Sequence, residues 1–362
     1  MGPLRLGIVG CGFVAENRHV PTLRRLSEID VVALADTDLA RCHRVAASLG
    51  APRCFDSVQA LLEHAEVEAV GVCTPASSHA EVALAALAAA RHTLVEKPIT
   101  LSLVEADRLV ESASRASVVT TVGFNLRHHR LVQEARRLLA GGAVGRVTAI
   151  ATSFTDSRLA VPNLPDWRGQ RHLGGGGLFE KLTHHFDLWR YLLDDEVDDV
   201  FAASRRGRAD DEVTLVTAHL QGGALAQAFG SDLTSPSNEV VIYGEEGSLL
   251  LDLYRFDGLV LSGLHDLPGA PKTRLRRMAA SAGQFARSLG ELRSGGLFDA
   301  TYGSEWRRFA AAVRGDGRPA CTFEDGRRAL QIALAAAESA SLGRPVRVAD
   351  AVPTVTPTEV PA

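Results

Sequence analysis

The first 123 residues alternate short apolar runs with amphipathic segments. The apolar runs are rich in β-branched residues and are too short for helices, whereas the segments between them have helical periodicity. Near-continuous apolar strands that alternate with helices predict a parallel sheet covered on both faces. We therefore expect a doubly wound α/β domain of the Rossmann type over residues 1–123, with strands at 4–9, 30–36, 53–55, 67–74, 92–97 and 118–124.

The pattern changes after residue 124. A helical segment leads into a series of alternating apolar and polar runs with short glycine-containing turns, which is typical of antiparallel strands. Residues 124–350 are therefore expected to form a second, α+β domain. Its strands are expected at 145–154, 212–220, 224–231, 239–244 and 247–254, and its helices at 131–142, 306–315 and 326–343. The Pro/Thr-rich tail, 351–362, is expected to be extended or disordered.

Residues 272–294 predict a basic amphipathic helix, which two glycines weaken. A run of this kind is most simply a solvated surface helix. A lid over a site and a contact between subunits are the alternatives.

Composition excludes several classes of protein. The 362 residues are 46% hydrophobic and 23% charged, which suits a globular chain with two cores. With a net charge of −4 and scattered arginines, the sequence shows no cluster of basic residues that would form a surface for nucleic acid. The five cysteines show no CxxC spacing. The sequence enters the first expected strand without the pattern of a signal peptide. The longest apolar run, 82–90, is too short to cross a bilayer. We expect a cytoplasmic protein without a membrane partner.

A glycine motif follows the first expected strand. The segment "GIVGCGFVA" places Gly10, Gly12 and Ala15 in a G-x-G-x-x-A pattern. The missing side chains permit a tight turn and let the backbone approach a pyrophosphate, which the following helix N-terminus attracts. Gly10 and Gly12, with the adjacent Phe13 and Val14, are expected to bind a dinucleotide.

Asp36 ends the second expected strand in "VVALADTD". A carboxylate at this distance from the glycines accepts hydrogen bonds from the adenosine ribose and repels a 2′-phosphate. The next arginine is Arg41. The pattern favours NAD over NADP, although an aspartate in a turn after a strand is also common.

The fourth expected strand ends in "VCTPASSHAEVA". Ligands bind outside the carboxyl ends of parallel strands, so Thr74, Pro75 and His79 are expected to face the cofactor. His79 also suits the first turn of a helix for purely structural reasons.

Several segments together resemble one known family. These are "GIVGCG", "TPASSHAEVALAALAAARHTLVEKPIT", "VGFNLRHH", "DWR", "GGGGLFEKLTHHFDLWRYL" and "CTFEDGRRALQIALAAAESASLGRPVRV". They resemble the glucose–fructose oxidoreductase / inositol dehydrogenase / rhizopine catabolism (Gfo/Idh/MocA) family of nicotinamide-dependent oxidoreductases. The resemblance implies a Rossmann domain followed by an open, mainly antiparallel sheet. It also implies that a sugar, cyclitol or related polyol is held between that sheet and the nicotinamide.

The resemblance assigns roles to particular residues. Lys97 of the E-K-P element is implied as the active-site lysine, with Glu96 and Pro98 fixing it, a cis Lys97–Pro98 peptide bond, and contacts from Glu96 and Lys97 to the cofactor. His184 matches the catalytic histidine that follows the glycine run. The family usually has aspartate four residues before this histidine, whereas this chain has Glu180. Glu180 keeps the carboxylate and is expected to pair with Lys97 or to bind a substrate hydroxyl.

The chemistry supports these residue types independently. Oxidation of a secondary alcohol requires a base for the hydroxyl proton, and histidine titrates near neutral pH. A partly desolvated lysine beside an oxidised nicotinamide can hydrogen-bond the same oxygen and exchange a proton, whereas arginine stays charged. Lysine is rare here, because only Lys97, Lys181 and Lys272 occur among 39 basic residues.

Further candidates flank these segments. Asn125 is expected to bind the nicotinamide or the substrate, and Arg127, Trp167 and Arg168 to contact the substrate together with Lys97, Glu180 and His184. Arg171 and His172 are either substrate contacts or part of a solvated loop. Asp187 has H-x-x-D spacing from His184, but adjacent histidines project differently from a helix and three ligands are not apparent, so we expect no metal.

We therefore expect an NAD-dependent oxidoreductase that acts on a sugar, aminosugar, glycoside or cyclitol hydroxyl. Two alternatives remain. One is a redox-neutral enzyme that uses bound NAD transiently for elimination or glycoside cleavage, and the other is a non-catalytic NAD-binding sugar sensor. By the resemblance, a homodimer or homotetramer formed through the second domain is also expected.

Overall fold

The computed structural model describes residues 2–50, 52–160, 166–267, 269–293 and 296–354. The chain divides into two compact units. Unit 1 comprises Met1–Asn125 and Tyr302–Leu330, and unit 2 comprises Leu126–Thr301 and Gln331–Ala362. Most of the expected tail, 351–362, lies outside the described residues.

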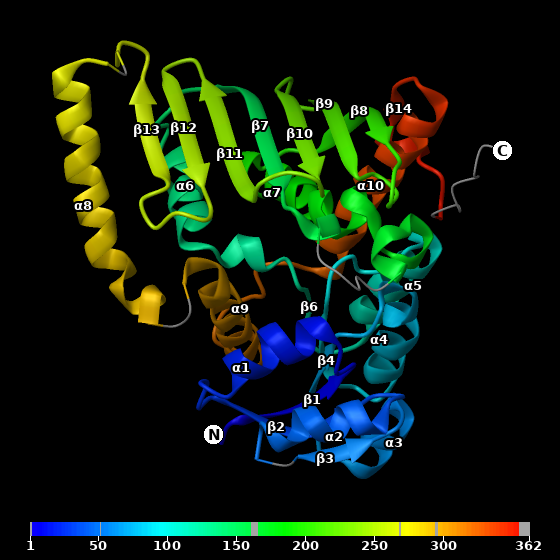
Figure 1. Cartoon of the computed structure of the whole chain (residues 1–362). Coiled ribbons are helices and arrows are strands. Elements are labelled where there is room, and N and C mark those ends of the chain that lie inside the picture. Colours follow the sequence, from blue (N-terminus) through cyan, green and yellow to red (C-terminus); the bar gives the residue numbers. More distant parts are fainter. Residues whose placement is uncertain (1, 51, 161–165, 268, 294–295, 355–362) are drawn as a thin grey trace. The chain divides into compact units, whose positions relative to one another are not determined.

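Unit 1 contains a six-stranded parallel sheet in the order β3-β2-β1-β4-β5-β6 (Figure 1). All four residues of β4 are buried, as are five of the six residues of β1, because helices cover both faces. The expected Rossmann fold is thereby confirmed. Its strands are β1 (Leu4–Val9), β2 (Ile29–Ala35), β3 (Arg53–Phe55), β4 (Ala69–Val72), β5 (His92–Val95) and β6 (Thr120–Val122).

The helices of unit 1 come from both ends of the chain. The N-terminal ones are η1 (Ala15–His19), α1 (Val20–Leu23), α2 (Leu39–Ala47), α3 (Val58–His64), α4 (His79–Ala88) and α5 (Leu103–Arg115). From Tyr302 onward, α9 (Leu297–Val313) also belongs to this unit, and the division falls within α10 (Phe323–Leu342). This differs from the expected boundaries of 1–123 and 124–350. The physical reason is Trp306, which is fully buried and whose ring would meet a Cβ added at Gly71 of β4 at 2.9 Å.

Unit 2 contains an eight-stranded sheet in the order β13-β12-β11-β7-β10-β9-β8-β14 (Figure 1). Its pairs are antiparallel except that β10 runs parallel to β7, which confirms the expected mainly antiparallel sheet. The strands are β7 (Val147–Thr155), β8 (Val197–Arg205), β9 (Val213–Leu220), β10 (Leu225–Ser231), β11 (Ser237–Gly244), β12 (Gly247–Asp252), β13 (Leu259–Gly263) and β14 (Val346–Arg347). The sequence patterns did not reveal β8, β13 or β14.

The two faces of this sheet differ. Along β9 buried and exposed residues alternate strictly, so one face is covered and the other is open. The register places five exposed large hydrophobic residues on the open face. We call these residues the outer apolar set: Phe201, Leu215, Leu225, Tyr243 and Leu250.

The remaining helices of unit 2 are α6 (Arg130–Ala140), η7 (Leu178–Leu182), α7 (Thr183–Leu193) and α8 (Pro271–Arg293). Helix α8 lies beside the edge strand β13 (Figure 1) and is anchored by polar contacts, among them Arg277 to Ser262 and Gln284 to the Leu259 carbonyl. Its Leu275 and Met278 are exposed. Among the described residues, no helix has the length and apolar character needed to cross a membrane.

Candidate active site

The glycine loop after β1 leaves space for a ligand. Gly10 has a φ of +93°, and a Cβ at this position would lie 2.6 Å from the backbone of Cys73, so only glycine fits. At Gly12, by contrast, an added Cβ would meet no atom within 4 Å. Phe13 is exposed beside it, and Val14 is partly buried. The loop therefore combines a turn that only glycine accommodates with an open backbone segment.

Asp36 lies at the end of β2 and is held by three groups. Its carboxylate accepts the backbone N–H of Cys11 at 2.7 Å and of Asp38 at 2.8 Å, and it forms an ion pair with Arg41 at 2.7 Å. Burial opposes ionisation of Asp36, but the hydrogen bonds from Arg41, Asp38 and Cys11 outweigh it and keep the pKa below its usual value. Asp36 is thus a fixed carboxylate.

The loops after β4 and β5 are joined by His79. Its Nδ1 lies 2.8 Å from the Pro98 carbonyl oxygen, and its Nε2 lies 2.9 Å from the Thr74 carbonyl oxygen. Burial lowers the pKa of this imidazole despite the two carbonyls, so the ring is neutral. A neutral ring has one N–H and donates to only one of the two carbonyl oxygens, whereas the other nitrogen only contacts the second oxygen. His79 thus lies between the Thr74–Pro75 segment and the Lys97–Pro98 segment, whose peptide bond is cis. The direct cofactor contact expected for His79 stays a prediction.

Glu96 directly precedes Lys97 and is buried. Its carboxylate accepts the Lys97 backbone N–H at 3.0 Å. Lys97 itself is partly exposed, and Asn125, at the end of unit 1, is buried. Unit 1 thus places Gly10, Thr74, Glu96 and Lys97 at the carboxyl ends of successive strands.

In unit 2, the glycine run 174–177 packs against main chain. A Cβ at Gly175 would lie 2.3 Å from the carbonyl oxygens of Trp167 and Arg168, and one at Gly177 would lie 2.4 Å from that of Asp211. The glycines thus fix the loop that contains Trp167 and Arg168. Arg171, in the same loop, forms a buried ion pair with Asp211 at 2.5 Å.

The two adjacent histidines of α7 have different surroundings. His185 is fully buried, stacks on Phe154 and lies with its Nε2 3.1 Å from Asn238 Oδ1. Burial lowers the pKa of His185 to about 4, so it stays neutral. His184 keeps 8% of its surface exposed. His184 is thus the less buried of the two, and the catalytic role that the resemblance implies for it stays a prediction.

Glu180 belongs to a network of ion pairs on η7. It pairs with Arg158 and, at 3.6 Å, with Arg168. The next residue, Lys181, is 1% exposed and pairs with Asp156 at 2.8 Å and with Asp232. The charged residue at position 181 is therefore neutralised within the core, as a buried lysine requires.

Arg127 is engaged by Asp187. The two side chains form a buried bidentate pair with N–O distances of 2.7 and 2.6 Å. The guanidinium also lies over the Tyr191 ring, 4.8 Å from its centroid. This arrangement favours a structural role for Arg127, and its contact with substrate stays a prediction. No group of three or more His, Cys, Asp or Glu residues in the described part of the chain could hold a metal ion.

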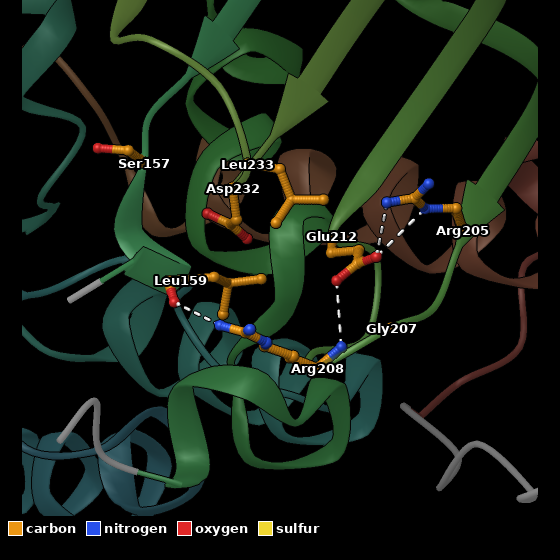
Figure 2. Close-up of a pocket in the computed structure, with 8 residues that line it drawn as sticks. All are labelled: Ser157, Leu159, Arg205, Gly207, Arg208, Glu212, Asp232 and Leu233. Carbon is orange, nitrogen blue, oxygen red and sulfur yellow. Dashed lines mark hydrogen bonds and ion pairs between the residues drawn. The ribbon is translucent and has the colours of Figure 1, made fainter. Parts of the chain in front are cut away.

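A cavity of about 470 Å³ opens beside this network. Its wall includes Asp232, the partner of Lys181, and Figure 2 shows the Glu212 carboxylate between the Arg205 side chain and the Arg208 backbone. Two arginines and two acids line the cavity with Ser157, Leu159, Gly207 and Leu233. Such a mixed lining suits a hydroxyl-rich ligand better than an ion of one sign.

Sequence reasoning did not identify three residues around these sites. His19 contacts Glu96, Arg158 contacts Glu180, and Trp306 contacts His19. The contact between Trp306 and His19 spans 287 residues, so no local spacing signals it.

Comparison with known proteins places the chain in a family. The model of the "Oxidoreductase family, NAD-binding Rossmann fold" matches residues 4–124, and that of the "GFO/IDH/MocA C-terminal domain" matches residues 132–250. The chain belongs to the GFO/IDH/MocA oxidoreductase family. This confirms the resemblance drawn from the sequence motifs.

Individual relatives of this GFO/IDH/MocA protein support the same family assignment. The myo-inositol 2-dehydrogenase of Thermotoga maritima is 25% identical over 358 residues, which cover 96% of this chain and 100% of the relative. The dTDP-3,4-didehydro-2,6-dideoxy-alpha-D-glucose 3-reductase of Streptomyces antibioticus is 32% identical over 257 residues, 69% of this chain and 75% of the relative. The crystal structure of an NAD binding oxidoreductase from Klebsiella pneumoniae has a TM-score of 0.81 at 25% identity, covering 96% of this chain and 99% of that one.

The residues of unit 1 fit NAD, the cofactor of this family's N-terminal domain. The open backbone at Gly12 leaves room for a pyrophosphate, and Asp36, whose carboxylate holds Asp38 and Arg41 here, is a residue of the type that binds a ribose. The contact of Asp36 with the ribose stays a prediction. The buried Thr74 Oγ1 has no hydrogen-bond partner among the described residues, so it can serve a ligand. NAD is thus the favoured cofactor of this GFO/IDH/MocA oxidoreductase.

The Asp36–Arg41 pair predicts the basis of cofactor choice. Replacing Asp36 with Ser removes ribose acceptors and frees Arg41, so we expect NADH to bind about tenfold more weakly and NADPH to bind more tightly. Cofactor fluorescence gives both dissociation constants without a substrate. The double variant Asp36→Ser, Arg41→Ala is the control and should lose the gain for NADPH. Unchanged NADPH binding in Asp36→Ser would contradict the prediction.

The Arg127–Asp187 pair predicts a large effect on stability. Asp187→Ala leaves a buried guanidinium without its carboxylate and should lower the free energy of unfolding by about 3–5 kcal/mol. Urea denaturation measures this change. Glu134→Ala, which breaks the surface pair with Arg137, is the matched control and should cost under about 1 kcal/mol. Equal, small losses in both variants would refute the structural role of the buried pair.

Proposed function

We propose that this oxidoreductase transfers hydride between NAD and a secondary hydroxyl of a sugar, aminosugar, glycoside or cyclitol. The observation that carries the proposal is the presence of Lys97 and His184 in a chain matched over 96% of its length to a myo-inositol 2-dehydrogenase. The sugar reductase of Streptomyces antibioticus supports the same substrate class.

The roles follow from the chemistry of the side chains. When bound, NAD supplies the acceptor for the hydride. His184 is proposed to accept the hydroxyl proton, because it is the less buried histidine of its pair. Lys97 is proposed to donate a hydrogen bond to the same oxygen and to stabilise its developing charge. Arginine could not accept or exchange the hydroxyl proton, because it keeps its own proton.

Glu180 is proposed to bind substrate through an oriented carboxylate. Arg158 and Arg168 fix it from two sides, which supports a rigid acceptor for a substrate hydroxyl. The longer side chain, compared with the usual aspartate, is thereby held in place. Trp167 and Arg168, in the loop supported by the glycine run, are proposed to contact the same substrate.

Assays with a panel of substrates test the function. Purified protein is incubated with NAD and with myo-inositol, D-glucose, N-acetylglucosamine or a methyl glucoside, while NADH absorbance is followed and products are identified by mass spectrometry. NADH with a ketone product supports the proposal. A product without NADH would indicate the redox-neutral enzyme, and binding without a product would indicate a sensor.

The proposed roles predict the behaviour of two variants. Lys97→Met and His184→Ala should each lower kcat by at least about 100-fold, the range for a lost general base or charge stabiliser. NADH affinity should change little in His184→Ala. Steady-state kinetics and cofactor fluorescence measure both quantities, and near-normal kcat in both variants would reject the mechanism.

A homo-oligomer is also proposed, with a second copy of the chain on the open face of the eight-stranded sheet. The outer apolar set supports this, because large hydrophobic side chains gathered on one face mark interaction surfaces. A cytoplasmic location is likewise proposed, and the five cysteines, all free, support it.

Substitutions in the outer apolar set should dissociate the proposed homo-oligomer. Leu215→Glu with Leu225→Glu puts charges on this face, so we expect a smaller species than the wild type by size-exclusion chromatography with light scattering. Leu275→Glu, at a still more exposed leucine on α8, is the control and should leave the mass unchanged. If α8 instead forms the subunit contact, only the control variant will dissociate.

A further inference from the structure

Three contacts in unit 1 connect helix α9 to the main chain of Lys97. The Trp306 indole Nε1–H donates to His19 Nδ1 at 2.9 Å. His19 Nε2 lies 2.8 Å from Glu96 Oε1, and the Lys97 N–H donates to Glu96 Oε2 at 3.0 Å. We call Trp306, His19 and Glu96 the Lys97 support chain.

The direction of these hydrogen bonds follows from the indole. A tryptophan N–H can only donate, so His19 Nδ1 must present its lone pair. The ring proton of neutral His19 is then on Nε2, which donates to Glu96. His19 is fully buried, with the rings of Tyr302 and Trp306 edge-on to it at 5.2 and 5.6 Å. Both the tautomer and the orientation of the imidazole are therefore fixed.

The surrounding charges place a negative charge on Glu96. Burial opposes its ionisation, but His19 and Lys97 lower its pKa. Glu305 of α9, by contrast, is 2% exposed, and neither of its carboxyl oxygens has a partner among the described residues. Burial and the charge of Glu96 raise the pKa of Glu305 well above its usual value, so this acid is neutral.

His19 itself is subject to opposed effects. Burial lowers its pKa, whereas Cys73 and Glu96 raise it, and on balance it is raised. A second ring proton could be placed only on Nδ1, where it would have to displace the Trp306 N–H. The Trp306 indole therefore disfavours the charged form of His19, although Glu96 favours that form. With His19 neutral, the negative charge of Glu96 is balanced by Lys97.

We propose that His19 and Trp306 are positioning residues for Lys97. They fix the carboxylate of Glu96, which in turn holds the Lys97 backbone and sets the charge beside its side chain. The inference rests on the proposed function, in which Lys97 contacts the reacting oxygen. Loss of the Lys97 support chain should therefore displace Lys97 and lower its titration midpoint, without removing any group that touches the substrate.

The scarcity of lysine allows a direct measurement. Reductive ¹³C-methylation of the intact protein labels exposed amines, and Lys97 is partly exposed, Lys272 exposed and Lys181 buried. Lys97→Met assigns the Lys97 signal, and Lys272 serves as an internal reference. The titration of each signal by NMR reports the charge around that lysine in the absence of substrate.

Two substitutions of His19 separate positioning from packing. His19→Phe keeps the ring but removes both hydrogen bonds, so the Glu96 carboxylate is no longer held in place beside Lys97. The Lys97 titration midpoint should then fall by at least about half a pH unit, because a neighbouring anion favours charged lysine. His19→Gln supplies an acceptor for Trp306 and a donor for Glu96, and should restore the wild-type midpoint.

Kinetics and a matched control complete the experiment. With a substrate from the panel, His19→Phe should lower kcat on the order of 100-fold with little change in KM, while His19→Gln retains most activity. Glu305→Gln, a neutral replacement in the same cluster, should leave the Lys97 midpoint unchanged. An unchanged midpoint in His19→Phe, or an equal shift in Glu305→Gln, would overturn the inference. Since NMR requires no turnover, a failure of the proposed function would leave this result readable.

Discussion

The register of the parallel strands in unit 1 determines where its chemical groups lie. Val9, Val72, Val95 and Val122 form one row across β1, β4, β5 and β6. The backbone bonds continue past this row, from Cys73 N to Val9 O and from Glu96 N to Val72 O. The glycine loop, the Thr74 loop and the segment of Lys97 therefore begin at the same level of the sheet. Each group depends on this alignment, because a shift of one residue would reverse its side chain's direction.

Buried polar side chains stabilise the loops that follow this row. His79 joins two loops through carbonyl oxygens, and His19 connects Glu96 to Trp306. A buried donor or acceptor left without a partner lowers the stability of the fold by about 1–3 kcal/mol. These hydrogen bonds therefore favour one conformation of each loop. Glu305, whose carboxyl oxygens have no partner within the described part of the chain, is tolerated because a neutral carboxyl group is cheaper to bury than a charged one.

In unit 2, buried cationic side chains are paired with carboxylates. Lys181 and Arg127 are both buried, yet each meets carboxylates from distant segments, namely Asp232 and Asp187. The place of Arg127 just beyond the sixth strand suggested a substrate contact, whereas its buried bidentate pair favours a structural role. For Glu180, sequence identified a carboxylate that departs from the family pattern, and the structure adds the two arginines that orient it.

The sequence by itself determined the two fold classes, the glycine loop, the NAD preference and the family, because these depend on local periodicity and on short motifs. It also identified Lys97 and His184 as candidates. Only the tertiary structure decided that α9 packs in unit 1, that Trp306 orients His19 and that His79 joins two loops. These contacts connect residues far apart in the chain, and only the packed core brings such residues together. Local sequence patterns do not record pairs of this kind.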